Sequence, residues 1–246
     1  MRKTTGVAVS VAISTFNRPM KVDRLIRSLL DQTLAPTRYE IVVVDNGSAT
    51  PIQLPIASSD RCRLLRFDLN QGRPRARSAA VAETSGEFIL FLDDDLVVGP
   101  GLLEQHVLAQ QEWSGVMAVG RIILPTERLV EPGIRFRQDL EAQGIPTERG
   151  LVEAPNFGTA ANVSIRRERY LQLGRFDPAL DGIEDQDFAM RHTAAGGKIA
   201  YLPEASPSTT MTGSIFSVSA DARKGEWSGR WHSADGIRFG KTASLD

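Results

Sequence analysis

The first apolar stretch of the chain alternates branched residues with small ones. Positions 7, 9, 11 and 13 are Val, Val, Val and Ile, and Ala or Ser stands between them. This alternation predicts a strand over 7–14 with one buried face. The basic start and apolar middle also resemble a secretory signal, but FNRP follows where a small-residue cleavage site would stand, so we favour the strand.

Helix and strand patterns then alternate along the first half. Segment 20–33 places Val, Leu and Ile at helical spacing, and the continuous apolar run 41–44 suits a strand that is covered on both faces. RLLRFDL predicts a third strand, NQGRPRARSAAVAET a loop that opens into a helix, and 88–92 a fourth strand. Such alternation predicts an α/β fold with a mainly parallel sheet and right-handed crossovers.

The second half of the chain is less regular. GVMAVGRIIL predicts a strand, 126–155 a long loop region, NFGTAANVSIRRERYLQLG a strand that leads into a short helix, GIEDQDFAMRHTAAGG a helix, and KIAYLPEA a last strand. From position 206 onward the chain is rich in Ser, Thr and Gly, so we expect a tail that is peripheral or partly mobile.

Composition narrows the class of protein. The chain has 246 residues, 41% of them hydrophobic, which suits one large α/β domain or two small ones. A net charge of -1 gives no support for non-specific adhesion to nucleic acid or to an anionic membrane. Cys62 is the one cysteine, so an internal disulfide and a multi-cysteine metal cluster are excluded and we expect an inert thiol. Since no stretch reaches the ~18 apolar residues of a membrane-spanning helix, we expect a soluble chain.

Polar residues follow several of the predicted strands. Asn17, Asp45, Asn70 and the run from Asp93 to Asp95 stand where these strands end. In open parallel sheets, ligands collect at the carboxyl ends of the strands. The sequence therefore predicts a nucleotide-binding crevice at this rim.

Three carboxylates close the apolar stretch GEFILFLDDDLVVG. If the strand continues through them, Asp93 and Asp95 face one way and Asp94 faces another. Two unit charges ~4 Å apart repel by about 1 kcal/mol in water and roughly 4 kcal/mol at an effective dielectric near 20. A divalent cation such as Mg²⁺ or Mn²⁺ would offset this repulsion. The alternative is a solvated turn or a helix N-cap before LVVGPGLLEQH.

A second acidic group opens the helix predicted in GIEDQDFAMRHTAAGG. Acids in a first helical turn are favoured by the helix dipole, and this alone could explain them. A chain with a metal and diphosphate site also needs a base for an attacking hydroxyl, and Glu184 and Asp185 are the candidates.

These segments together resemble a known family, the inverting glycosyltransferases of family 2, which have the nucleotide-sugar-binding fold called GT-A. The matching segments, in order, are VAISTFNRP, SLLDQT, EIVVVDNGS, NQGRPRARSAAV, GEFILFLDDDLVV, NVSIRRERYLQLGRFDPAL and GIEDQDFAMRHTAAGGKIAYLPEA. Each is common alone, but seven in this order make a specific match over roughly 7–205. The resemblance implies a Rossmann-like GT-A domain over 1–205, with a nucleotide-binding half at 1–99 and an acceptor-binding half at 100–205, and leaves 206–246 as a tail.

The resemblance also implies roles for residues on the nucleotide side. Asp45 would contact the base or ribose, and Thr15 and Asn17 would help to line that pocket. Arg77 would support the nucleotide from a segment that is often Ala-Arg-Asn in the family; here Ser78 takes the place of the Asn.

The carboxylates receive the remaining roles by the same resemblance. Asp93 and Asp94 would contact the nucleotide-sugar, with Asp93 near the sugar and ribose. Asp95, together with Asp93, would bind Mg²⁺ or Mn²⁺ at the diphosphate. Asp185 matches the family's catalytic base, with Glu184 beside it near the acceptor. The implied reaction is a single in-line displacement at the anomeric carbon, with inversion.

One departure from the family concerns the metal. Many relatives carry a His shortly after the PEA segment, whereas this chain has Ser208, Thr209 and Thr210 there. The metal would then be held less tightly, or by His232 of the tail. Arg230 and Trp231 are not accompanied by a processive-synthase pattern, and we expect them to pack or to cover the site.

The resemblance further implies a donor, an acceptor and a setting. A UDP-sugar is the favoured donor, with a saccharide or glycolipid as acceptor, and the acceptor pocket is expected from 126–160 and the tail. We expect a role in cell-surface polysaccharide or glycolipid assembly in bacteria, in the cytoplasm or peripherally at the inner face of the membrane.

Other functions remain open at this point. A nucleotidyltransferase uses a similar sheet but normally shows a Gly-rich signature with a Lys after the first strand, which STFNRP lacks. A degenerate module that binds nucleotide-sugar without turnover is suggested by the missing His. A response-regulator receiver would be shorter and would carry its acids at the first strand. His106 and His192 are interpreted as surface or packing residues.

Overall fold

The structure is a computed structural model that describes residues 6–55, 61–123, 148–152, 160–209, 218–221, 226–229, 231–232 and 238–239. The chain divides into two compact units. The first unit comprises 1–123 and 146–210, and the second comprises 124–145 and 211–246. The candidate site residues lie in the first unit, which is described first, except for His232, Arg230 and Trp231 of the tail, which lie in the second.

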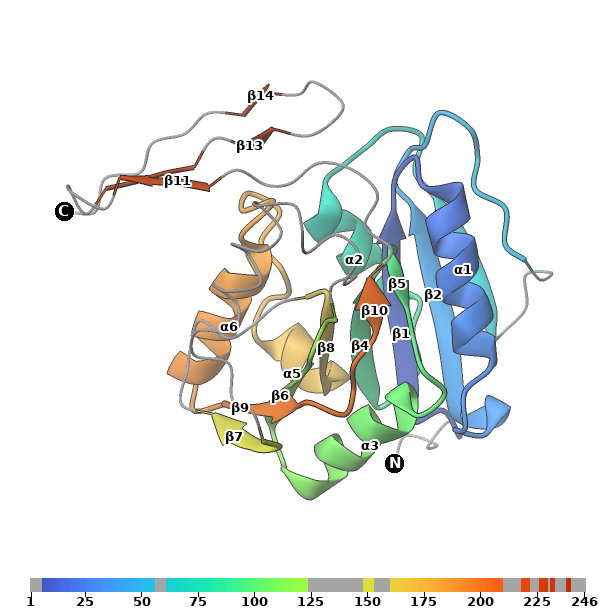
Figure 1. Cartoon of the computed structure of the whole chain (residues 1–246), viewed down its shortest axis with the longest axis vertical. Coiled ribbons are helices and arrows are strands. Elements are labelled where there is room, and N and C mark those ends of the chain that lie inside the picture. Colours follow the sequence, from blue (N-terminus) through green and yellow to red (C-terminus); the bar gives the residue numbers. More distant parts are fainter. Residues whose placement is uncertain are drawn as a thin grey trace. The chain divides into compact units, whose positions relative to one another are not determined.

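The first unit is built on an eight-stranded sheet with the order β3-β2-β1-β4-β8-β6-β9-β7 (Figure 1). Its strands are β1 (Val9–Thr15), β2 (Tyr39–Asp45), β3 (Cys62–Arg66), β4 (Phe88–Asp93), β6 (Val116–Gly120), β7 (Gly150–Val152), β8 (Asn162–Arg166) and β9 (Lys198–Leu202). The first four strands are parallel to one another, whereas β8 runs antiparallel to its neighbours β4 and β6, and β7 runs antiparallel to β9. This mostly parallel sheet confirms the predicted fold class.

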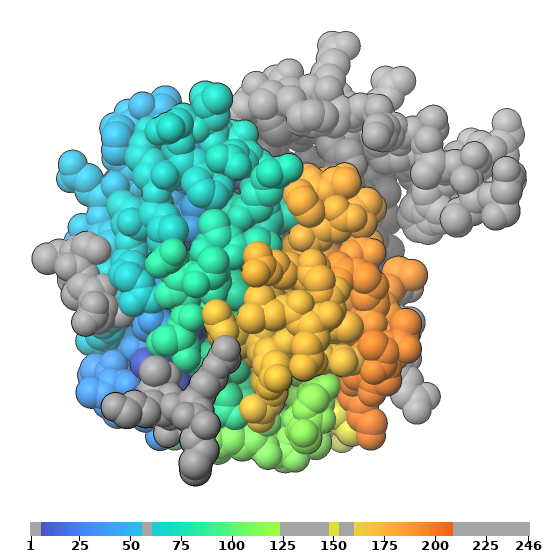
Figure 2. All heavy atoms as spheres, turned by 180° about the vertical axis from the view of Figure 1, so that it is seen from behind, coloured from blue at the N-terminus to red at the C-terminus, as the bar shows by residue number. Residues whose placement is uncertain are grey.

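Two layers of helices cover the sheet because its strands are apolar on both faces. The helices are α1 (Pro19–Leu30), η1 (Pro36–Arg38), α2 (Arg73–Ala82), α3 (Leu102–Glu112), α5 (Arg167–Gln172) and α6 (Glu184–Ala194). Side chains from α1 and α3 belong to one buried cluster, and those from α2, α5 and α6 belong to another. Figure 2 shows the second face, with the teal α2 region beside the yellow-to-orange α5 and α6 regions.

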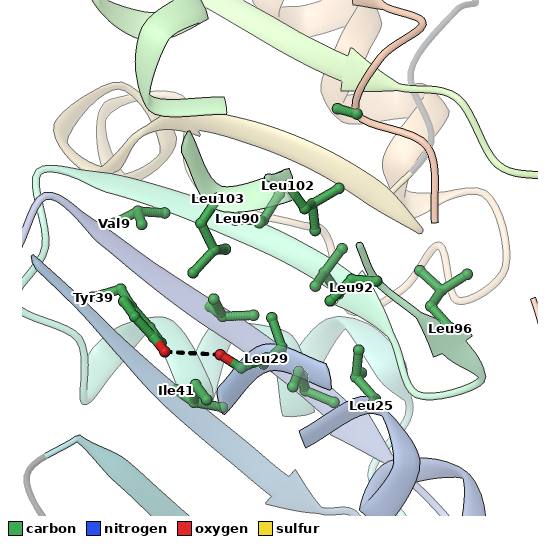
Figure 3. Close-up of a cluster of buried hydrophobic side chains, with 14 of the residues drawn as sticks. Val9, Leu25, Leu29, Tyr39, Ile41, Leu90, Leu92, Leu96, Leu102 and Leu103 are labelled. Atoms are coloured by element: carbon green, nitrogen blue, oxygen red, sulfur yellow. Dashed lines mark hydrogen bonds between the residues drawn. The ribbon is translucent and has the colours of Figure 1, made fainter. Parts of the chain in front are cut away.

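Alternate residues along each strand point into these two clusters. Val11 and Ile13 of β1 pack on the α1 face, while Ala12 between them packs on the α2 face. Figure 3 shows the cluster on the α1 face, where the Tyr39 hydroxyl donates a hydrogen bond to the Leu29 carbonyl at 2.8 Å. This bond satisfies a carbonyl near the end of α1 and fixes the helix to β2.

The predicted elements of this unit are confirmed, with shifted ends. The first strand covers Val9–Thr15 rather than 7–14, the first helix ends at Leu30, and the third strand covers Cys62–Arg66 rather than 63–69. The fourth strand extends one residue past the predicted 88–92, to Asp93. A short pair formed by β5 (Leu96–Val97) and β10 (Ser208–Thr209) was not predicted, and β7 (Gly150–Val152) is a strand where a loop region over 126–155 was expected.

In the second unit the structure describes two short hairpins. Strand β11 (Val218–Asp221) pairs with β12 (Glu226–Gly229), and β13 (Trp231–His232) pairs with β14 (Arg238–Phe239), both antiparallel. The expected acceptor pocket in 126–160 falls mostly on 124–147 and 153–159, outside the described residues. The side chains of Trp231 and His232, and all of Arg230, also lie outside them.

Among the described helices, none combines the length and the apolar character that crossing a membrane requires.

Candidate active site

The carboxyl ends of four neighbouring strands lie side by side at one edge of the sheet. Thr15 of β1 lies opposite Asp45 of β2, and Asp45 lies opposite Arg66 of β3. On the other side of β1, Ser14 lies opposite Asp93, the last residue of β4. The predicted crevice residues Thr15, Asp45 and Asp93 therefore share one rim.

The three consecutive carboxylates have different surroundings. Because β4 ends at Asp93 and the chain then turns, the alternation expected of an extended strand does not continue through Asp94 and Asp95. Asp94 is 4% exposed, and its carboxylate accepts hydrogen bonds from Thr15 Oγ1 at 2.7 Å and Arg18 Nη1 at 3.0 Å. Burial raises the pKa of Asp94 more than Arg18 and Thr15 lower it. Asp94 thus fastens the loop after β1 to the end of β4.

Asp95 lies beside a lysine of α1. Its Oδ2 is 3.7 Å from Lys21 Nζ, and its side chain is 13% exposed. Burial and the neighbouring Asp93 raise the pKa of Asp95, Lys21 and Arg18 lower it, and the net change is upward. The surroundings of Asp95 therefore favour a further positive charge.

The Asp45 carboxylate is fully buried within its own loop. The backbone N–H groups of Ser48 and Ile52 donate hydrogen bonds to it at 3.0 and 3.2 Å, and Arg66 Nη1 donates another. Burial opposes ionisation, but these hydrogen bonds lower the pKa of Asp45 below its usual value. In this structure Asp45 shapes the loop after β2, and its contact with a nucleotide stays a prediction.

Asparagines join the loops that follow the first three strands. Asn17 has a φ of 55°, its backbone N–H donates to Ser48 Oγ at 2.8 Å, and its Oδ1 accepts from the Ala49 N–H at 2.9 Å. Asn46 Nδ2 donates to Asn70 Oδ1 at 3.0 Å. The predicted rim residues Asn17 and Asn70 thus belong to one hydrogen-bonded group of loops.

Arg77 of α2 connects two acids that are distant in the sequence. Its Nη2 donates to Asp93 Oδ1 at 2.6 Å and its Nη1 donates to Glu184 Oε1 at 2.7 Å. The side chains of Arg77 and Glu184 are both 2% exposed, and the second oxygen of Glu184 accepts from the Gly182 N–H at 2.7 Å. Arg77 therefore links the end of β4 to the start of α6, and its contact with a nucleotide stays a prediction.

Asp185, the predicted base, lies in the first turn of α6 and is half-buried. Its Oδ2 accepts a hydrogen bond from the Ala160 N–H at 3.1 Å, and its Oδ1 accepts from the Gln186 N–H at 2.9 Å. The next residue, Ala161, accepts a hydrogen bond from the Asp93 N–H at 3.1 Å. One short segment therefore contacts both predicted acids.

Arg73 at the start of α2 brings a further positive charge. Its Nε is 3.6 Å from Asp181 Oδ1, and its side chain is 47% exposed. Burial lowers the pKa of Arg73, but the carboxylates of Glu184, Asp93 and Asp181 raise it by more. This exposed cation is available to an anionic ligand at the rim.

The comparisons with known proteins agree with this arrangement. The family described as Glycosyl transferase family 2 matches residues 10–159, more than half of the chain. The chain belongs to this family. An uncharacterized glycosyltransferase of Haemophilus influenzae is 28% identical over 185 residues, which cover 74% of this chain and 61% of that protein. The succinoglycan biosynthesis protein ExoO of Rhizobium meliloti is 29% identical over 208 residues, which cover 80% of this chain and 59% of ExoO.

Solved structures support the GT-A fold of this family 2 chain. The crystal structure of S. aureus TarS 1-349 matches with a TM-score of 0.66 and 19% sequence identity, covering 83% of this chain and 60% of TarS 1-349. Its complex with UDP-GlcNAc matches with a TM-score of 0.64. The chain spans about three fifths of the length of these proteins.

The oxygen ligands that Asp93 and Asp95 offer are of the kind that a divalent cation prefers. Asp93 and Asp95 offer carboxylate oxygens from side chains that are 33% and 13% exposed. In the described ranges no group of three or more His, Cys, Asp or Glu residues could hold a metal ion. One or two carboxylates completed by substrate phosphates are a common Mg²⁺ site, and this pair suits it.

Several contacts at this rim, and some buried polar residues beyond it, were not found from the sequence. Arg18 and Lys21 follow β1 and pair with Asp94 and Asp95, which follow β4. The sequence held a sign of these pairs, because basic residues come after one predicted strand and acidic residues after a strand predicted to lie near it. His106 and His192 are both buried. Asn162 hydrogen-bonds to His106 and was missed, because no local pattern distinguishes it from other strand residues.

Proposed function

We propose that this chain transfers one sugar from a nucleotide diphosphate donor, with UDP favoured, to a hydroxyl of a saccharide or glycolipid, with inversion at the anomeric carbon. One observation carries the proposal. The neighbouring residues Ala160 and Ala161 hydrogen-bond to Asp185 Oδ2 and to the Asp93 N–H, respectively, both at 3.1 Å. One segment thus contacts the carboxylate of Asp185, which is suited to a base, and the backbone of Asp93, whose carboxylate is suited to the diphosphate end.

The donor is proposed to lie along the rim formed by β1, β2 and β4. Asp93 and Asp95 would hold Mg²⁺ or Mn²⁺, which would supply positive charge for the leaving diphosphate. The upward pKa shift of Asp95 supports this role, since burial and the Asp93 charge both disfavour its ionised form. Arg73 and Lys21 are further cations from which the diphosphate would gain charge-assisted contacts.

Asp185 is the proposed base. Each of its oxygens accepts one backbone hydrogen bond, which fixes the carboxylate and leaves lone pairs for an acceptor hydroxyl. Asp185 would take the hydroxyl proton as the acceptor oxygen bonds to the anomeric carbon and the bond from that carbon to the diphosphate oxygen breaks. A single displacement inverts the configuration. The ion pairs of Arg77 with Glu184 and Asp93 would hold the start of α6 at a fixed position relative to the end of β4.

The comparisons support the donor and the setting. TarS has been solved in complex with UDP and with UDP-GlcNAc. ExoO is named for succinoglycan biosynthesis, and RfbC of Myxococcus xanthus, 30% identical over 214 residues, for O-antigen biosynthesis. We therefore propose a role in polysaccharide biosynthesis, with the donor used in the cytoplasm and a glycolipid acceptor met at the inner face of the membrane.

Two substitutions separate donor binding from chemistry. Asp185→Asn is expected to keep UDP affinity by calorimetry within a few-fold, and to lower sugar transfer by about 10²- to 10⁴-fold because the base is lost. Asp95→Ala is expected to weaken Mn²⁺-dependent UDP binding. Asp187→Asn is the matched control, because Asp187 lies on the same helix but pairs with Arg191.

The outcomes decide between an enzyme and a binding module. Transfer by Asp185→Asn at the rate of the unmodified protein would remove Asp185 as the base. Mn²⁺-dependent UDP binding by the unmodified protein, with no transfer from any UDP-sugar to a panel of saccharide and glycolipid acceptors, would favour the non-catalytic module.

A further inference from the structure

A buried chain of polar side chains runs between α3 and β8. It consists of Gln110 and His106 from α3, and Ser164 and Asn162 from β8, each at most 3% exposed. Gln110 Nε2 lies 3.0 Å from Ser164 Oγ, which lies 2.9 Å from His106 Nδ1. His106 Nε2 lies 2.9 Å from Asn162 Oδ1. None of these residues has a part in the proposed chemistry so far.

For the hydrogen bonds among these four side chains, chemistry decides which atom donates and which accepts. Asn162 Nδ2 lies 2.8 Å from the Ala205 carbonyl and 3.3 Å from the Arg121 carbonyl, and both carbonyls can only accept. Asn162 Oδ1 must then accept from His106 Nε2–H, so His106 Nδ1 accepts from the Ser164 hydroxyl. Burial lowers the pKa of His106 to about 4, which agrees with a neutral ring.

The backbone of Asn162 begins the strand that borders the predicted acids. Asn162 pairs with Leu92, the residue before Asp93. The two preceding residues make the hydrogen bonds to Asp93 and Asp185. Both of these bonds are therefore made by the two residues that lead directly into Asn162.

The side chain of Asn162 also holds the segment that follows β9. Beyond Ala205, Ser208 pairs with Val97 of β5, directly after the run of carboxylates. The amide has little room to move, because a Cβ on Gly120 would lie 2.1 Å from Asn162 Nδ2. Asn162 thus ties together the segments on either side of Asp93 to Asp95.

We propose that Asn162, oriented by His106, is a positioning residue that fixes Ala160 and Ala161 and so sets the spacing between Asp93 and Asp185. The catalytic consequence rests on the proposed function, whereas the positioning itself does not. Misplacement of reacting groups by about 1 Å can lower a rate by about 10²-fold. Loss of the orienting hydrogen bond should therefore lower kcat more than it weakens donor binding.

Substitutions at His106 test this role. His106→Leu removes the donor to Asn162, whereas His106→Gln offers an amide N–H near the position of the imidazole Nε2. Gln110→Met is the matched control, since it removes another of the four buried polar side chains, one that hydrogen-bonds to Ser164 and does not touch Asn162. For each variant, kcat and the donor KM are measured with a UDP-sugar well below the Tm, and hydrogen exchange is measured at the Ala160 amide.

We expect His106→Leu to lower kcat about 10- to 100-fold with little change in the donor KM, and to speed exchange at Ala160. His106→Gln should restore most of kcat, and Gln110→Met should change only the Tm. Equal kcat in His106→Leu and Gln110→Met, or unchanged exchange at Ala160, would overturn the proposal. If the unmodified protein transfers no sugar, the proposed function fails instead, and the exchange at Ala160 alone decides the positioning.

Discussion

The contact of Arg77 with two carboxylates makes a quantitative prediction. Arg77→Met removes a guanidinium that is 2% exposed and leaves Glu184, also 2% exposed, with the hydrogen bond from the Gly182 N–H but without its cation. Removing one member of a buried ion pair costs about 3–5 kcal/mol, chiefly because the other charge stays buried. Asp93 contributes less, since its side chain is 33% exposed and water can replace the lost partner. We therefore expect Arg77→Met to lose about 3–5 kcal/mol of unfolding free energy.

A second substitution tests this explanation. Arg77→Met/Glu184→Gln has no unpaired carboxylate at position 184, and the Gln carbonyl can still accept from the Gly182 N–H. The double variant should therefore have about 1–3 kcal/mol more unfolding free energy than Arg77→Met. Urea unfolding at pH 7, followed by circular dichroism, measures all four members of this double-mutant cycle. The reasoning is refuted if Arg77→Met loses less than about 1 kcal/mol, or if the two substitutions are additive.

Three further predictions concern stability and reactivity. Burial raises the pKa of Glu40, but hydrogen bonds from Ser10, Ser85 and Arg63 lower it by more. A pKa that is lower in the folded than in the unfolded state stabilises the fold fully above about pH 4.3, the unfolded pKa of Glu, and this stabilisation is lost as the pH falls through the folded pKa. Glu40→Gln should therefore flatten the pH dependence of the urea midpoint in that pH window. Burial raises the pKa of Cys62 to about 11, so a thiol reagent at pH 8 should label it only on unfolding. Gly47→Ala should lose more stability than Gly174→Ala: both glycines have positive φ, but a Cβ at Gly47 would lie 2.4 Å from Leu69, whereas nothing lies within 4 Å at Gly174; equal midpoints would contradict this.

The sheet could be predicted from the sequence because its information is local. Alternating and continuous apolar runs located β1, β2, β4, β6, β8 and β9 within a few residues. Their parallel order then brought Thr15, Asp45 and Asp93 to one rim, as the sequence predicted. The acids that open α6 were also visible, since the apolar pattern of that helix starts directly after them.

The contacts inside the site could not be predicted in the same way. Arg77 and Glu184 are separated by 107 positions, and no local pattern pairs them. Asp93 and Asp95 were expected to face one way if the strand continued through them, but this condition is not met because the chain turns directly after Asp93. Arg18 and Lys21 look like an ordinary helix start until the neighbouring strand end supplies their carboxylate partners.

The central claim is that the carboxylates at the end of β4 bind a nucleoside diphosphate together with a divalent cation. The most direct measurement is calorimetric titration of UDP, GDP and TDP into the unmodified protein and into Asp95→Ala, each with Mn²⁺ and with a chelator. The account predicts that UDP binds only with Mn²⁺ and that Asp95→Ala abolishes or strongly weakens this binding. Equal UDP affinity with chelator, or in Asp95→Ala, would contradict it.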